Sequence, residues 1–365
     1  MPPLVEIEAG SLPENTIMKK TLFVTMLAAA LMGGQVFAYI PTVISGSEYD
    51  ADAKYYGKYS GTGDVSGGSI SIGESQQGAD MSGATVYGCG TTAGSASASN
   101  SVLTMSGGQV SKIYGGTAGA GGAVIGNTVI VTGGKAASIY AGQVANGEIS
   151  GNRIFVTGVD GESTPNIGMG GASIMNDNVL HLIGAGASVS TEYGKLEGSA
   201  MRLGNIILTG IAREKSGNTL NIYGSNITAT YLQLVQRLNF HLNPGLPTET
   251  SPMLTLTTET GTQALNLGTL ESSIEVYGDA VEDWSAFEGR SITLVQTNVA
   301  IKGFEQAAVV NITSAAGAVL ATATLDISND LKQLNLIDIK AVPEPTTGTL
   351  SLLALAALAA RRRRK

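Results

Sequence analysis

The chain has 365 residues and a formal net charge of −8 at pH 7, with only 14% charged residues and as many as 49 glycines. The negative charge argues against nucleic acid or an anionic membrane surface as a binding partner. Low charge combined with 43% hydrophobic residues is atypical of a disordered chain and favours a fold with many tight turns and small polar side chains on its surface.

The N-terminal region predicts export. Two lysines precede an apolar run over residues 22–32, and Val36 and Ala38 stand at the −3 and −1 positions of a cleavage site. Residues 18–38 are therefore predicted to be a signal peptide, removed by signal peptidase between Ala38 and Tyr39. Residues 1–17 are polar and acidic and fit no targeting pattern, and we interpret them as a mis-assigned start of the reading frame.

Two features precede the main repeats. Residues 39–65 are rich in tyrosine and aspartate, and we expect an N-terminal cap or a loose arm, because the open end of a repeat would expose strand edges. Cys89 is the single cysteine, so no intrachain disulfide is possible. With no base nearby in the sequence, Cys89 is interpreted as a small, semi-buried residue and not as a nucleophile.

A repeat of about 26 residues begins near residue 101 and is clearest when the units are aligned on one glycine. The aligned glycines are Gly107, Gly133, Gly158, Gly184 and Gly210. Four residues before them lie Leu103, Val129, Ile154, Leu180 and Ile206, and two residues before them lie Met105, Val131, Val156, Leu182 and Leu208. A separation of two places these apolar columns on one face of a strand. The column between them is mixed, as on a partly covered outer face: Thr104, Ile130, Phe155, His181 and Ile207.

Tyrosine and asparagine recur with the same period. The tyrosines are Tyr87, Tyr114, Tyr140 and Tyr193, and the asparagines are Asn100, Asn127, Asn152, Asn178 and Asn205. Asparagine tolerates left-handed backbone angles, so it suits a recurring corner. The amides either stack into a ladder or serve only as turn residues, and the sequence does not decide between these two roles.

Two short strands and a glycine-rich corner in each unit predict an all-β fold. We expect a right-handed parallel β-helix, a solenoid with coils of about 26 residues, over residues 66–232. A β-propeller would need blades of ~40 residues, and a leucine-rich repeat would need a Leu-x-x-Leu-x-Leu signature that is absent. Gly224 follows Gly210 by only 14 residues, so the repeat register breaks there.

Residues 233–340 show alternating apolar residues at shorter spacing, and they predict a C-terminal β cap or, alternatively, irregular final coils. This region contains the densest group of carboxylates: Asp279, Glu282, Asp283 and Glu288, around Trp284. Their spacing does not match a calcium-binding loop, so a solvated loop that buries the tryptophan is favoured over a weak Ca²⁺ site.

The sequence offers few residues for catalysis. His181 and His241 have no neighbouring cluster of metal ligands and are interpreted as outward-facing strand residues. The glycine-rich runs lack the Gly-Lys-Ser/Thr ending of a phosphate loop. Many β-helices are polysaccharide lyases or hydrolases, but the carboxylates of this repeat fall mainly in connections of different lengths and not on one strand column. We expect no catalytic residue, no metal and no cofactor, with a glycan-cleaving enzyme as the alternative.

The last 25 residues form a distinct segment, 341–365. Val342-Pro343-Glu344-Pro345 precedes an apolar run over 349–360, and the chain then ends in a basic cluster: Arg361, Arg362, Arg363, Arg364 and Lys365. At ~1.5 Å per residue the apolar run is shorter than the ~30 Å hydrocarbon core of a bilayer. The cations are expected to stay on the cytoplasmic side. An ordinary single-span tail anchor is the alternative interpretation.

In this order of parts the segment resembles the PEP-CTERM sorting signal. The resemblance implies that an exosortase removes the tag at the bacterial cell surface and that Glu344 contributes to recognition. The Gly-, Asn- and Tyr-rich repeat is similar to the β-helical passengers of autotransporter adhesins, although no barrel-forming strands follow it. We therefore expect an exported cell-surface protein with a structural or adhesive role, for which an extracellular glycan or exopolysaccharide is a candidate partner.

Overall fold

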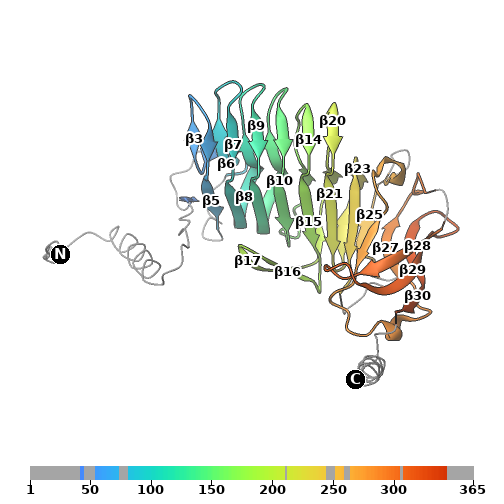
Figure 1. Cartoon of the computed structure of the whole chain (residues 1–365). Helices are drawn as coiled ribbons and strands as arrows, with labels where there is room; N and C mark the ends of the chain where they lie inside the picture. Colours follow the sequence, from blue (N-terminus) through green and yellow to red (C-terminus); the bar gives the residue numbers. More distant parts are fainter. Residues whose placement is uncertain are drawn as a thin grey trace, which may run out of the picture. The chain divides into compact units, whose positions relative to one another are not determined.

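The computed structural model describes residues 42–44, 54–73, 81–209, 212–243, 251–258, 264–304 and 307–342. Within this part the protein is built almost wholly of β-strands, most of them paired in parallel (Figure 1). The strands form four ladders, named here the first to the fourth. An antiparallel hairpin and an antiparallel C-terminal pair complete the sheet structure.

The first ladder supplies the largest apolar surface. Its strands are β1 (Thr42–Ile44), β5 (Ser69–Ile72), the starts of β8 (Val102–Thr117) and β10 (Thr128–Gln143), β12 (Arg153–Val156), β15 (Val179–Ile183), β21 (Thr219–Tyr223), β24 (Arg237–His241), β26 (Glu275–Tyr277) and β28 (Ala308–Thr313). The two apolar columns predicted from Leu103 to Leu182 pair in register here and are fully buried.

The second and third ladders complete each unit. The second contains β2 (Lys54–Tyr56) and β3 (Tyr59–Ser60), both paired with β6 (Thr85–Thr91), the ends of β8 and β10, β13 (Asn166–Gly168), β19 (Asn205–Ile207) and β23 (Tyr231–Gln233). The third contains β4 (Val65–Ser66), β7 (Ser97–Ser99), β9 (Ala123–Ile125), β11 (Glu148–Ser150), β14 (Ile174–Asn176) and β20 (Glu214–Ser216). The expectation of two strands per unit is thus corrected to three.

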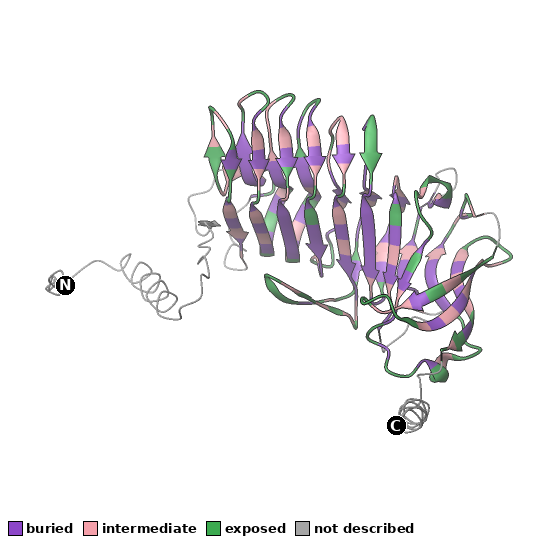
Figure 2. Cartoon of the chain, in the orientation of Figure 1, coloured by how far each residue is buried: buried purple, intermediate pink, exposed green. Residues whose placement is uncertain are grey.

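Most inward side chains of the four ladders share one hydrophobic core, which runs from Ile70 to Ile339 (Figure 2). Val65, Cys89 and Ala98 form a small cluster of their own. Glycine allows the chain to turn sharply between the first and second ladders. Gly134 has φ +88°, and a Cβ at this position would lie 2.7 Å from the carbonyl oxygen of Gly107 in the preceding unit. A larger residue is therefore excluded there by both conformation and space.

A chain of buried asparagine amides occupies the corner between the third and first ladders. Asn127, Asn152, Asn178 and Asn218 are at most 1% exposed. Along this chain each Nδ2 donates to the next Oδ1 at 3.1, 2.9 and 2.9 Å. Each Nδ2 also donates to a backbone carbonyl of the preceding unit, and each of the next Oδ1 atoms accepts a backbone N–H as well. The asparagines are therefore a stacked ladder and not merely turn residues.

The sequence alignment of the last repeat unit, which contains Ile206 and Leu208, was wrong. Ile206 pairs with Ile167 in the second ladder, and Leu220 and Ile222 occupy the positions after Leu180 and Leu182 in the first. In the same way Asn218 continues the amide ladder in place of Asn205. Asn100 is also outside the ladder, where Ser101 takes the corresponding position and donates its backbone N–H to Asn127 Oδ1.

The reason for the shift is an insertion after β15. The antiparallel hairpin of β16 (Ser188–Thr191) and β17 (Gly194–Glu197) lengthens this unit, so that Asn178 and Asn218 are separated by 40 residues, against 26 for the step before. The insertion is followed by the fourth ladder: β18 (Met201–Arg202), β22 (Ile227–Ala229), β25 (Leu254–Leu256) and β27 (Ile292–Thr297).

The parallel ladders continue past residue 232 and end in antiparallel strands. β28 and β27, the last strands of the first and fourth ladders, are joined through β29 (Val319–Ile327) and β30 (Gln333–Ala341). The edges of β27 and β28 at this end are therefore paired and do not offer a template for another chain. Two short 3-10 helices, η2 (Leu267–Thr269) and η3 (Trp284–Phe287), lie in the connections, and Trp284 is buried against the core.

Replacing Asn152 by alanine is expected to lower the free energy of unfolding by about 3 kcal/mol. The substitution leaves the Asn127 N–H without its acceptor and removes the Asn152 Nδ2 donor from the Val124 carbonyl and from Asn178 Oδ1, which keeps only the backbone N–H of residue 152. A buried unpaired group costs ~1–3 kcal/mol. Urea denaturation of both proteins measures the difference.

Asn100→Gly is the matched control. The Asn100 side chain is exposed and its φ of +53° is one that glycine adopts freely, so a loss below about 1 kcal/mol is expected. Equal losses in the two variants would contradict a stabilising role for the amide ladder.

Candidate functional site

A ladder of aromatic rings runs along the outer face of the first ladder. Its members are Phe155, His181, Tyr223, His241 and Tyr277, with successive ring centroids 4.4, 5.9, 4.0 and 4.7 Å apart and nearly parallel planes. The longest step lies between His181 and Tyr223. There the rings move from one outward column to the next, because His181 is in register with Asn221 and Tyr223 is in register with Ile183.

The hairpin β16–β17 covers part of this face. Leu196 packs with Ile130, Phe155 and Ile183 in a small cluster separate from the main core. The tip is held by an Arg153–Glu192 ion pair at 3.2 Å and by the Tyr193 hydroxyl, 3.4 Å from Thr128 Oγ1. The outer face of the first ladder is therefore apolar and covered under the hairpin, and it is accessible only where the hairpin does not lie over it.

Tyr193 is a correction to the predicted tyrosine column, because it lies in the hairpin and is 41% exposed. The stack on the second ladder consists of Tyr56, Tyr87, Tyr114 and Tyr140, with centroids 4.8, 5.2 and 5.3 Å apart. Tyr56 lies in the segment predicted to be an N-terminal cap or arm, outside the aligned repeat units, so the sequence pattern does not place it in the stack. In both stacks the ring faces contact one another, which leaves mainly ring edges for a ligand.

Both histidines are held neutral by their surroundings. Burial is the main cause that lowers the His181 pKa to about 3, with smaller contributions from His241 and Arg153. Burial also lowers the His241 pKa to about 4, against a smaller opposing effect of Asp279. The His181 Nδ1 lies 3.2 Å from the Tyr223 hydroxyl, so the expected outward-facing histidine is half-buried and hydrogen-bonded.

Hydrogen bonding assigns the tautomer of His241. Asn221 Oδ1 accepts from Asn239 Nδ2 at 3.0 Å and lies 3.2 Å from His241 Nε2. Because that oxygen can only accept, the proton of the neutral ring lies on Nε2. His241 Nδ1 therefore keeps its lone pair and is a hydrogen-bond acceptor.

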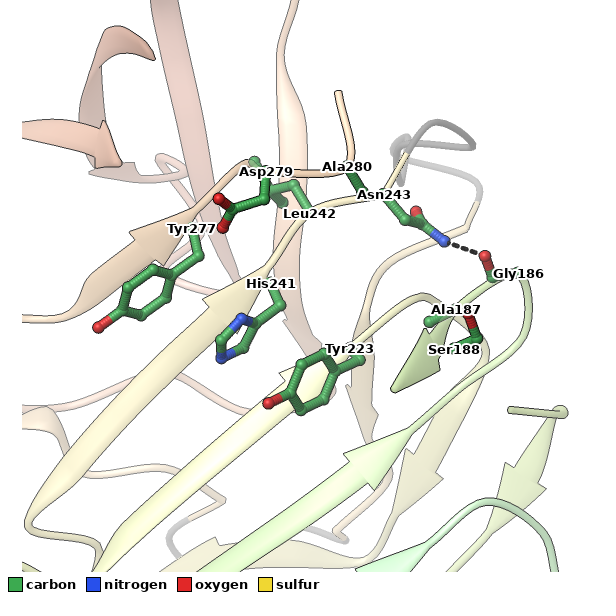
Figure 3. A pocket seen from close by; sticks show the side chains of 10 residues that line it. All are labelled: Gly186, Ala187, Ser188, Tyr223, His241, Leu242, Asn243, Tyr277, Asp279 and Ala280. Carbon is green, nitrogen blue, oxygen red and sulfur yellow. Dashed lines mark hydrogen bonds between the residues drawn. The ribbon is translucent and has the colours of Figure 1, made fainter. Parts of the chain in front are cut away.

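A pocket of about 230 Å³ lies at the end of the aromatic ladder, where the hairpin leaves the first ladder (Figure 3). It is lined by the start of the insertion, the ends of β21, β24 and β26, and the residues that follow β24 and β26. The lining residues are Gly186, Ala187, Ser188, Tyr223, His241, Leu242, Asn243, Tyr277, Asp279 and Ala280. It is the candidate binding site of the chain, because it combines apolar walls with convergent polar groups.

Asn243 is the least accessible polar residue of the pocket, 5% exposed. Its Nδ2 donates to the Gly186 carbonyl at 2.6 Å, which ties the end of β24 to the insertion, as Figure 3 shows. Its Oδ1 is buried and has no hydrogen-bond partner among the described residues. Asp279, at the opposite wall, accepts from the Ala315 N–H at 2.8 Å. The sequence interpretation did not single out Asn243, whose only signal is its place directly after a strand.

The four carboxylates considered for calcium do not converge. Asp279 binds the Ala315 N–H, Asp283 caps η3 through the Ser285 N–H and hydroxyl, and Glu288 accepts from the Ala341 N–H. Glu282 is exposed. Within the described ranges no three His, Cys, Asp or Glu side chains are grouped to hold a metal ion. Hydrogen bonding to Ser285 lowers the Asp283 pKa, which is consistent with its use as a helix cap.

Cys89 is fully buried beside the amide ladder. Its Sγ donates to Asn127 Oδ1 at 3.3 Å, and burial raises the thiol pKa to about 11. A thiol that stays protonated is a poor nucleophile. The residue was expected to be semi-buried, and the structure corrects this to full burial.

The C-terminal segment begins at the end of the described residues. β30 ends at Ala341, and the Val342 N–H donates to the Leu320 carbonyl at 3.0 Å. Pro343, Glu344, Pro345 and the basic cluster from Arg361 to Lys365 lie outside the described residues, as does the predicted signal peptide with Ala38 and Tyr39. In the part of the chain that the structure describes, no helix has the length and apolar character needed to cross a membrane.

Comparison with known families identifies this segment. The family model described as the PEP-CTERM protein-sorting motif matches residues 341–365. No curated protein and no solved structure matches the chain. The chain therefore carries a PEP-CTERM sorting motif, which implies export, membrane-associated sorting and processing by an exosortase.

The pKa values of the two histidines give a test of the aromatic ladder. We expect NMR titration of the folded protein to place both well below 6.5, near 3 for His181 and near 4 for His241. Because the unfolded chain binds protons near pH 6.5 and the folded chain does not, stability should fall as the pH falls from 6.5 towards 5. The slope is at most roughly 1.4 kcal/mol per pH unit for each histidine.

His181→Phe is the matched variant, since phenylalanine preserves the stacking with Phe155 but cannot bind a proton. It should reduce this acid sensitivity between pH 6.5 and 5. Titration of either histidine near 6.5 would mean that its ring is solvated and the outer face is open.

Proposed function

We propose that the mature chain is a right-handed parallel β-helix exposed at the bacterial cell surface, where it has a structural or adhesive role. The observation that carries this proposal is the combination of a long parallel stack of β units with a sorting motif placed directly after its last strand.

The β-helix is supported by the order of the ladders. From β7 to β20 the chain visits the third, first and second ladders in the same sequence in every unit, and each strand pairs in parallel with its counterpart in the next unit. Parallel crossover connections are right-handed in nearly all proteins, which supports the hand of the helix.

Exosortase processing is compatible with the fold. The described strand pairings end at Ala341, and Val342 is 42% exposed, so a cut after Val342 leaves all of these pairings intact. The prolines at 343 and 345 favour an extended backbone, which is the form that processing enzymes bind. Export through signal peptidase cleavage after Ala38 is the matching N-terminal step of this proposal.

The adhesive role is supported by the surface of the stack. The third ladder presents mainly small or polar side chains outward, among them Ser97, Ser99, Ser150 and Asn176. Repetition along the stack lets weak contacts to an extended partner add up by avidity. An extracellular glycan or exopolysaccharide is the partner class that fits a polar, weakly acidic face of this kind.

We favour binding over cleavage of a glycan. Glycosidases use a pair of carboxyl groups about 5 to 10 Å apart, and Asp279 is the sole carboxylate among the residues that line the pocket of Figure 3. In the described repeats, Glu162, Glu192 and Glu197 are used in exposed ion pairs. Release of oligosaccharides from a polymer by the purified protein would instead support the enzyme.

The intact mass of the protein isolated from the surface of the producing bacterium tests the sorting proposal. We expect a mature species that begins at Tyr39 and ends between Val342 and Pro345. Glu344→Ala should retain the tag and remain in the membrane fraction, whereas Thr347→Ala, in the same segment, should be processed. A wild-type mass that includes Arg361 to Lys365 would make the protein a membrane-anchored precursor and remove the basis for a surface role.

A further inference from the structure

The pocket of Figure 3 is rich in hydrogen-bond acceptors. Asn243 Oδ1 is buried without a partner in the described part of the chain, and His241 Nδ1 carries a lone pair because Nε2 holds the proton. The Asp279 carboxylate adds two oxygens, both of which accept from the N–H of Ala315. His241 and Asp279 thus bring acceptors to the lining of one pocket of about 230 Å³, whereas the Asn243 oxygen is buried and not accessible from it.

The tyrosine and asparagine donors of the same region already have partners. The Tyr277 hydroxyl donates to Glu275 Oε2, and Asn243 Nδ2 donates to the Gly186 carbonyl. The Tyr223 hydroxyl lies 3.2 Å from His181 Nδ1. A ligand that satisfies this pocket must therefore bring several donors of its own.

Asn243 fixes the shape of the pocket. Its Nδ2 joins the end of β24 to the insertion at Gly186, so the wall formed by the insertion is held beside His241.

Most of the remaining lining residues are apolar or aromatic: Ala187, Ala280, Leu242, Tyr223 and Tyr277. Pockets for drug-sized molecules usually measure about 300–1,000 Å³, so this one, at about 230 Å³, has room for a single small ring. A ligand that carries both C–H groups and hydroxyl donors matches a lining of apolar residues and acceptors.

We propose that this pocket binds one neutral pyranose unit of a glycan, whose hydroxyl groups donate to His241 Nδ1 and the Asp279 carboxylate. The proposal rests on the adhesive function proposed above and assigns it a site. Sugars are the ligand class that carries several hydroxyl donors and C–H groups on one small ring. Because burial keeps the His241 pKa near 4, its Nδ1 remains an acceptor at neutral pH.

NMR signals of the two histidines can report sugar binding. The chain has only His181 and His241, so it gives two histidine Hε1 resonances. His241 lines the pocket and His181 does not. The probes are the methyl glycosides of glucose, galactose, mannose and N-acetylglucosamine, titrated at millimolar concentration into the mature protein. We expect at least one to shift the His241 resonance in a saturable manner, with a smaller change for His181.

The variant Asp279→Asn tests the contact directly. An asparagine oxygen can still accept from the Ala315 N–H, but the charged acceptor is lost, and we expect at least tenfold weaker sugar binding with an unchanged melting temperature. Asp283→Asn is the control, because Asp283 lies outside the pocket lining and caps η3. It should bind as the wild type does.

Three results would overturn the site. The first is the absence of any saturable His241 shift with all four glycosides, and the second is equal affinity of Asp279→Asn and wild type. The third is a His241 shift with Ca²⁺ or Zn²⁺ alone, which would assign the acceptors to a cation.

Binding of purified exopolysaccharide from the producing bacterium separates this site from the adhesive function. If wild type and Asp279→Asn bind the polymer equally, the proposed sugar site in the pocket is wrong, and the adhesive function is still supported. If wild type does not bind the polymer and shifts with no glycoside, both the site and the glycan-binding role fail.

Discussion

The buried asparagine amides hold the units of this protein in register. Each amide joins neighbouring units through both of its polar atoms, and no side chain of the ladder is more than 1% exposed. In a β-structure a slip of one residue would turn every inward side chain outward. The ladder opposes such a slip, because it would leave several amide groups unpaired in an apolar core. The apolar columns and the tyrosine stack depend on this alignment.

The hairpin insertion is the main departure from regularity, and the candidate site follows from it. It lengthens one step of the amide ladder from 26 to 40 residues, covers the outer face over Phe155, and introduces a fourth parallel ladder. Where its first residues leave the sheet, they form a wall opposite the ends of β24 and β26. A regular stack presents a flat outer face, and the insertion provides the concavity that a small ligand requires.

The last described strand and the sorting motif meet at residue 341. The antiparallel strands β29 and β30 pair with β28 and β27, the last parallel strands of the first and fourth ladders. The outer edges of these two strands are therefore covered. The sorting motif begins at residue 341, where β30 also ends. A cut after Val342 would therefore leave the described strand pairings intact.

The sequence alone determined the all-β character, the apolar columns from Leu103 to Leu182 and the sorting motif, because strand alternation and a linear motif are local properties of the chain. The tertiary structure decided which unit each residue joins after the insertion, and so placed Leu220 instead of Ile206 in the first ladder. It also brought Tyr56 into a stack and Asn243, His241 and Asp279 into one pocket. The physical reason is that parallel pairing joins residues tens of positions apart, and the length of an inserted segment does not reveal in which ladder the chain resumes.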